Sequence, residues 1–283
     1  MPDPMDTTEL HPIYRISGLG RSIELKYPTH RFVVGVSVLF GVAGTLLGLS
    51  NSLPVGEAIS SGLNLSLTAF LAWALLRELA PDSEQSAYVA GGLSALTWLA
   101  FGVQNIPVLL VSLLAARMVS RSPGRAMSGA DTILVIGGLA FAPEPHRWAM
   151  GFIIGAAMAM DGAFSAPADQ RRRPEHLPLG LIAMVVITWF GRPVWQPPES
   201  PWWIVLAAIL VAGMLAIALQ PPADSVGDVD GQTLSTQRVR AGAALGVGVF
   251  ALSGWTSGDP WSSLAAGWVC VVALLMAPLL GRR

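Results

Sequence analysis

The chain has 283 residues, of which 53% are hydrophobic and only 12% are charged, and its formal net charge is -1. Soluble domains carry roughly 25% charged residues, so this composition predicts an integral membrane protein whose main partner is the lipid bilayer. A single lysine, Lys26, and a net charge near zero exclude a basic face for nucleic acid, and the lone Cys270 excludes a disulfide within the chain.

The first 31 residues are polar, and they lack the charged-then-apolar pattern of a cleaved signal peptide. Between residues 13 and 27, apolar side chains alternate with Arg15, Arg21 and Lys26, which is typical of a segment lying on the inner face of a membrane. We therefore expect a cytoplasmic or interfacial segment over residues 1–31, a single membrane domain over residues 32–280, and a cytoplasmic tail over residues 281–283.

About ten apolar stretches follow, each bounded by proline, glycine or charged residues. They lie near Phe32–Leu49, Ala58–Leu76, Ala87–Phe101, Ile106–Val119, Thr132–Phe141, Trp148–Phe164, Leu179–Phe190, Trp202–Leu219, Ala241–Leu252 and Trp261–Leu280. Several are shorter than the roughly 20 residues that cross a bilayer without tilt, which leaves a count of eight to ten. The sequence thus predicts an all-α, polytopic helix bundle with about ten transmembrane helices.

The basic residues give the direction of the spans. Ten spans with the N-terminus inside place fifteen of the seventeen basic residues on one side, namely Arg15, Arg21, Lys26, Arg31, Arg77, Arg117, Arg121, Arg125, Arg171, Arg172, Arg173, Arg238, Arg240, Arg282 and Arg283. Only Arg147 and Arg192 fall opposite. Because cytoplasmic loops carry the excess of arginine and lysine, this pattern predicts that both termini are cytoplasmic. The same pattern predicts that the chain turns between Gly102 and Pro107, because a continuous helix there would place Arg117, Arg121 and Arg125 on the outer side.

Five helices on each side of residue 145 would form two halves, 32–143 and 147–280. Arg31-Phe32 with Gly35 and Arg147-Trp148 with Gly151 open the two halves alike. The size, ten spans, inner termini and five-plus-five arrangement resemble the drug/metabolite transporter superfamily in topology, without a matching motif. This resemblance implies a secondary transporter.

Polar residues within apolar stretches mark candidate sites. Glu57, Ser61, Asn64 and Thr68 recur at helical spacing, so they line one face, either beside a polar path or as hydrogen-bonding contacts between helices. Asp161, late in the sixth stretch, is either a site that couples transport to a proton or cation, or a hydrated helix end.

Two aspartates, Asp82 and Asp131, are expected at the cytoplasmic face. Met127–Gly138, with the sequence MSGADTILVIGG, resembles the second catalytic motif of type IV prepilin peptidases, although Ala130 replaces the usual second glycine. The resemblance implies an intramembrane aspartyl peptidase with Asp131 as one catalytic residue and Asp82 in the place of the other. The alternative for Asp131 is a helix N-cap.

Taken together, the residues favour a multi-pass secondary transporter or permease of the cell inner membrane. Its path for a small solute would run along Glu57, Ser61, Asn64 and Thr68, with Asp161 in the coupling role. The peptidase and a non-catalytic membrane subunit or scaffold are the alternatives, and an oligomer or a partner subunit is left open. No cofactor or metal site is expected, because the histidines are scattered and the acidic loops lack ligand spacing.

Overall fold

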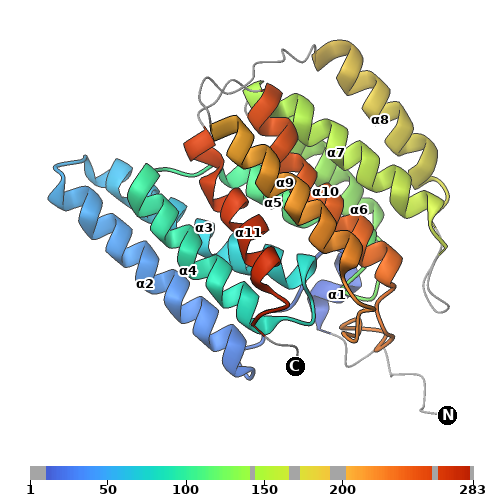
Figure 1. Ribbon diagram of the computed structural model, residues 1–283, viewed down its shortest axis with the longest axis horizontal. Helices are drawn as coiled ribbons and strands as arrows, with labels where there is room; N and C mark the ends of the chain where they lie inside the picture. Colours follow the sequence, from blue (N-terminus) through green and yellow to red (C-terminus); the bar gives the residue numbers. More distant parts are fainter. Residues whose placement is uncertain (1–10, 141–143, 166–172, 192–201, 257–260, 281–283) are drawn as a thin grey trace.

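The computed structural model describes residues 11–140, 144–165, 173–191, 202–256 and 261–280, and within them the chain forms helices without a named strand. The helices are α1 (Pro12–Ile16), α2 (Pro28–Ser50), α3 (Val55–Leu79), α4 (Glu84–Phe101), α5 (Ile106–Ser120), α6 (Gly129–Ala140), α7 (Glu144–Ala163), α8 (His176–Gly191), α9 (Trp202–Leu219), α10 (Thr236–Thr256) and α11 (Ala265–Met276), with a short 3-10 turn, η1 (Trp261–Leu264), before α11. Figure 1 shows α2 to α11 gathered into one bundle.

Each predicted apolar stretch overlaps one of the helices α2 to α11, which confirms the all-helical bundle. Among the described residues, three helices, α2, α3 and α10, are both long and apolar enough to cross a membrane. A helical membrane protein is therefore supported. That the other helices also cross the bilayer stays a prediction.

The break between α4 and α5 is a tight turn, as expected. Gly102 adopts a positive φ of 80°, which glycine tolerates because it has no Cβ. The side chain of Asn105 then caps α5 by accepting a hydrogen bond from the Val108 amide, and Pro107 occupies the first turn. Proline is favoured there because its missing N–H would have no partner inside the helix.

Close packing of the bundle relies on small residues. A Cβ added to Gly180 of α8 would lie 2.4 Å from backbone atoms of Gly155 and Ala159 in α7, and Gly62 of α3 meets the backbone of Gly41 in α2 in the same way. Such contacts between backbones are typical of helices that pack in lipid.

The outer helices expose large apolar side chains. Examples are Ile133 of α6, Trp189 of α8 and Leu215 of α9, which are 74%, 77% and 57% exposed. Contiguous apolar surface of this kind is unfavourable in water but suits contact with lipid chains.

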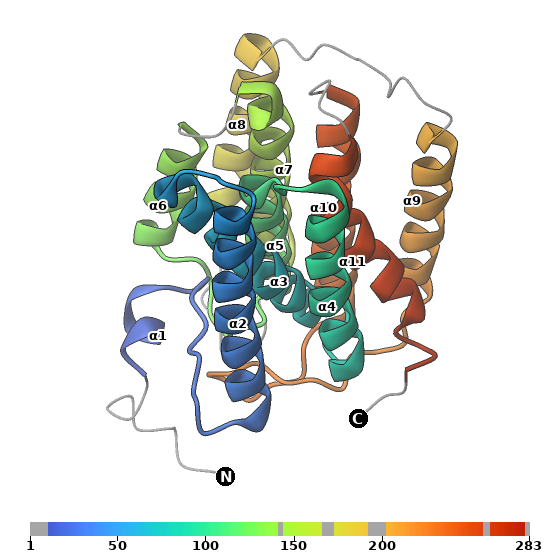
Figure 2. The same cartoon turned by 90° about the vertical axis from the view of Figure 1, so that its left-hand side faces the viewer.

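The charged connections meet at one end of the bundle. Figure 2 shows α1 and the end of α11 at the lower end of the upright helices, together with the connection from α9 to α10. We call this the polar end; it comprises residues 11–27, 80–83, 121–128, 173–175 and 220–235. Its parts contact one another, since the Asp228 amide donates to the Ser122 carbonyl and the Ser225 amide to Asp82. The structure brings together, at one end of the bundle, connections that the sequence predicts to share one side of the membrane. That this side is cytoplasmic stays a prediction.

Candidate functional site

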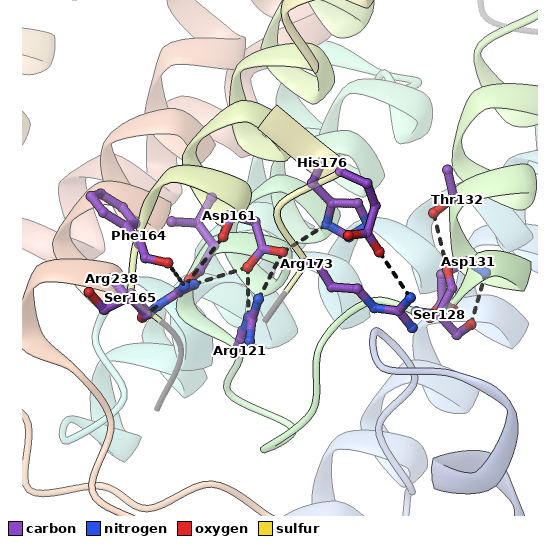
Figure 3. A network of polar contacts seen from close by, with 12 residues as sticks. Arg121, Ser128, Asp131, Thr132, Asp161, Phe164, Ser165, Arg173, His176 and Arg238 are labelled. Carbon is purple, nitrogen blue, oxygen red and sulfur yellow. Dashed lines mark hydrogen bonds and ion pairs between the residues drawn. The ribbon is translucent and has the colours of Figure 1, made fainter. Parts of the chain in front are cut away.

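Asp161 lies at the centre of a buried cluster of charges, drawn in Figure 3. Its Oδ1 accepts hydrogen bonds from Nε of Arg121 at 2.6 Å and Nη1 of Arg238 at 3.0 Å. Its Oδ2 accepts a bond from Nη2 of Arg121 at 3.1 Å and lies 2.9 Å from Nδ1 of His176. All four residues are at most 3% exposed. We call these four residues the Asp161 cluster.

The members of this cluster come from the polar ends of four helices. Arg121 is the C-cap residue of α5 and has the left-handed φ of 53°, Asp161 is near the end of α7, His176 opens α8, and Arg238 is in the first turn of α10. Arg238 also donates to backbone carbonyls at the ends of α5 and α7, those of Val119, Asp161, Phe164 and Ser165. Carbonyls at a helix C-terminus carry partial negative charge, so they help to balance the positive charge of the Arg238 guanidinium. The cluster thus ties α5, α7, α8 and α10 together.

A second buried carboxylate, that of Glu78, contacts Ser122, the residue after Arg121. Glu78 is in the last turn of α3 and 2% exposed. It accepts a hydrogen bond from Nε of Arg117 at 2.8 Å and another from the Ser122 hydroxyl, and Nη1 of Arg21 lies 3.6 Å away. Because Arg121 and Ser122 are adjacent, the end of α5 links the Asp161 and Glu78 carboxylates.

The N-terminal segment, residues 11–27, is bound to the polar end by charged side chains. Arg21 pairs with both carboxylate oxygens of Asp228, with Nε–Oδ2 at 2.6 Å and Nη2–Oδ1 at 2.7 Å. Arg117 donates to the Leu19 carbonyl at 3.3 Å, and Arg125 donates to the carbonyl of Tyr14. Burial of the Arg21 guanidinium lowers its pKa, but the charges of Glu78 and Asp228 outweigh burial and raise the pKa above its ordinary value. Arg21 therefore stays charged.

Asp131, in the first turn of α6, forms hydrogen bonds with the N-terminal segment. Its carboxylate accepts bonds from the Ser17 hydroxyl at 2.5 Å and the Gly18 amide at 2.7 Å. It also accepts a bond from the Ser128 amide at 2.8 Å, while the Asp131 amide donates to the Ser128 hydroxyl at 3.1 Å. This reciprocal pair is a capping box, which satisfies free amides at the start of α6.

Asp82 is engaged elsewhere on the polar end. Its Oδ1 accepts bonds from the amide and hydroxyl of Ser225 at 2.8 and 2.6 Å, and its Oδ2 accepts one from the Asp224 amide. Asp82 and Asp131 thus hold different segments, and among the described residues no contact joins them. The peptidase reading stays a prediction without a paired carboxylate to support it.

The predicted stripe follows α3 in the half away from the polar end. Glu57 is exposed, Ser61 is half-buried and Thr68 is buried. Asn64 donates from Nδ2 to the Gln104 carbonyl at 2.9 Å and accepts from the Gln104 amide at 3.0 Å. The structure therefore keeps these four together on one helix but separates them from Asp161.

Gln104 extends this contact to a third helix. Its side chain accepts a bond from the Ala266 amide at the start of α11 and donates to the Ser262 carbonyl, at 3.0 and 3.1 Å. Asn64 and Gln104 thus fasten α3, the α4–α5 turn and α11 together at the end of the bundle opposite the polar end.

Three cavities of ligand-binding size lie at the polar end, none of them lined by the stripe. The first, of about 500 Å³, is lined by charged side chains that include Arg21, Asp82 and Asp228. The second, of about 480 Å³, is mostly apolar and shares Pro81 and Asp82 with the first. The third, of about 460 Å³, is lined by Arg15, Arg125, Arg173 and the N-terminal segment. Small-molecule sites commonly span about 300–1,000 Å³.

Within the described ranges, no group of three or more histidine, cysteine, aspartate or glutamate side chains is placed to hold a metal ion. Comparison with known proteins finds no family model, no curated protein and no solved structure that matches this chain. The function is therefore argued from the site itself.

Proposed function

We propose that the protein is a multi-pass inner-membrane protein with ten transmembrane helices and cytoplasmic termini, and that it acts as a secondary transporter or permease for a small polar solute. The support for the membrane arrangement is the exposed apolar surface of the outer helices together with the gathering of arginines at the polar end. With the polar end inside, the connections rich in arginine face the cytoplasm.

The observation that carries the transport proposal is the first cavity, of about 500 Å³. In a chain with so few charges, its wall combines Arg21 and Arg77 with Glu24, Asp82 and Asp228. Walls that offer both signs of charge suit a polar or zwitterionic solute, because each end of such a solute finds a partner. The cavity would be the cytoplasmic entrance to the path.

The Asp161 cluster would act as a closing element beside this entrance. Alternating access requires one group of helices to move against another. The close Gly155–Gly180 contact makes α7 and α8 one unit, and the bonds from Asp161 to Arg121 and Arg238 tie that unit to α5 and α10. In this conformation the two guanidiniums hold the Asp161 carboxylate in its charged form, so it would take up a proton only after these bonds open. The proton would then keep the bonds from re-forming, which would couple movement to a proton.

The Asn64–Gln104 contact would close the path at the opposite end. In this conformation the Asn64 side chain is bound to the α4–α5 turn, so the buried Thr68 beyond it would become accessible only after that contact opens. Under this proposal, the described conformation would be a state open toward the polar end.

Thiol labelling tests both the topology and the path. In a Cys270→Ala background, single cysteines replace Asp224 on the first cavity, Thr68 on the stripe, and Leu67, which is 43% exposed on the outer face of α3. A membrane-impermeant maleimide is applied to intact cells and to inverted vesicles. We expect Asp224→Cys to react only in inverted vesicles, Thr68→Cys to react from an aqueous side, and Leu67→Cys to stay unlabelled.

Labelling of Asp224→Cys from outside the cell would overturn the topology. No labelling of Thr68→Cys from either side, with or without an added Asn64→Ala change that opens the contact, would overturn the path and favour a non-catalytic membrane subunit.

A further inference from the structure

The third cavity differs from the first in the sign of its charge. It lies between the N-terminal segment, the α5–α6 connection, the connection before α8 and the α9–α10 connection. Each of the first three contributes one arginine to the wall, Arg15, Arg125 and Arg173, and the only acid in the wall is Asp230. Three guanidiniums and one carboxylate leave an excess of positive charge around this space, which a bound anion would offset.

Arg173 retains a hydrogen-bond donor for a ligand in this cavity. Arg173 pairs with Glu175 at 3.2 Å, but the Glu175 side chain is 48% exposed, so that pair is screened by water. Nε of Arg173 is buried and, among the described residues, has no hydrogen-bond partner. A buried N–H without a partner is costly, and an acceptor in the cavity would satisfy it.

The hydroxyls in the wall are already engaged. The Ser17 hydroxyl donates to Asp131, and the Ser128 hydroxyl donates to the Ile16 carbonyl at 2.9 Å. The donors that remain for a ligand are therefore those of guanidinium groups. Guanidinium forks match the oxygens of phosphate groups, which accept paired, charge-assisted hydrogen bonds.

We propose that the cavity lined by Arg15, Arg125 and Arg173 binds a phosphate group, carried either by an anionic lipid headgroup or by a small soluble phosphate compound. The site is separate from the solute cavity, and the proposal does not rest on the transport function. Its position at the polar end, next to the ends of the helices, brings it within reach of both sources. Bound phosphate would bridge the N-terminal segment to the connection before α8.

The test uses the full-length protein in two kinds of nanodisc, one of phosphatidylcholine alone and one that also contains phosphatidylglycerol. Native mass spectrometry reports retained phosphatidylglycerol, and thermal unfolding in phosphatidylcholine reports the effect of added inorganic phosphate or pyrophosphate. Arg173→Gln is the main variant, because among the described residues the Arg173 side chain pairs with the exposed Glu175. The matched control is Arg31→Gln, an exposed arginine of α2 that does not line the cavity.

We expect Arg173→Gln to require about tenfold more ligand for the same retention or the same phosphate-induced rise in Tm. This is the effect of losing one charge-assisted contact. Arg31→Gln should match the wild type, and Arg173→Lys, which keeps the charge but loses the fork, should fall between them. Lipid retention without an effect of inorganic phosphate or pyrophosphate identifies the headgroup, and the reverse identifies a soluble phosphate compound.

Two results would overturn the proposal. One is that neither phosphatidylglycerol nor the added phosphates bind the wild type. The other is that Arg173→Gln and Arg31→Gln lose binding equally, which would mean that general positive charge and not this cavity attracts the anion. A folded Arg173→Gln protein is recognised by its unchanged Tm in phosphatidylcholine without phosphate, and Arg15→Gln provides a second test if it is not.

Discussion

Replacing Asp161 by asparagine should destabilise the protein strongly. The change keeps the shape of the side chain but removes the charge that two buried guanidiniums share, those of Arg121 and Arg238. Removing one partner of a buried ion pair costs about 3–5 kcal/mol, because the remaining charge is left without compensation. For a chain of this size each kcal/mol shifts Tm by about 2–4 °C, so we expect Asp161→Asn to unfold roughly 6–20 °C below the wild type.

The assay is thermal unfolding of the purified protein in detergent, followed by tryptophan fluorescence. Glu57→Gln, at an exposed carboxylate of α3, is the matched control and should stay within about 2 °C of the wild type. Adding Arg121→Met to Asp161→Asn should recover part of the loss, since it removes one uncompensated charge, and the double-mutant cycle should give a coupling of about 0.5–3 kcal/mol. An Asp161→Asn protein as stable as the control would refute the role given to the cluster.

Three further changes test other contacts. Gly180→Ala places a Cβ 2.4 Å from the α7 backbone and should cost about 1–3 kcal/mol in thermal unfolding, whereas Gly92→Ala, with nothing within 4 Å, should be neutral or slightly stabilising. Asp131→Ala should speed cleavage by trypsin within residues 11–27 while circular dichroism stays unchanged; equal cleavage would show that other contacts hold the segment. Asn64→Leu leaves the Gln104 amide without its partner, while the Gln104 carbonyl keeps the bond that it accepts from the Ile106 amide at 3.0 Å. It should lower stability by about 1–3 kcal/mol, and a wild-type Tm would contradict this.

The helices could be predicted from the sequence because hydrophobic length is a local property. Apolar runs between Gly, Pro and charged residues mark each helix without knowledge of its neighbours, and the turn at Gly102–Pro107 is encoded by residues that favour it. The prediction that the arginines share one side of the membrane rests on the same apolar runs. Each of these predictions uses only residues near one another in the chain.

The partners of Asp161 could not be predicted in this way. Its bonds come from Arg121 and Arg238, which are 40 and 77 residues away along the chain, and helical periodicity carries no information at that range. Sequence reasoning counted these arginines only for their side of the membrane and did not select Glu78 at all. The available signal was the presence of a carboxylate at the end of an apolar stretch, which in a membrane protein requires a cation nearby.

The contact between Arg21 and Asp228 sets an order for biosynthesis. The two residues are separated by 207 positions, which at roughly 5–20 residues per second corresponds to about 10–40 s of translation. The N-terminal segment therefore leaves the ribosome long before its last partner is made. Glu78 is available to Arg21 much sooner, as the first of its two acidic partners. The polar end can close only after α9 has been synthesised, so a nascent chain stalled before residue 220 would leave Arg21 and its segment without their final anchor.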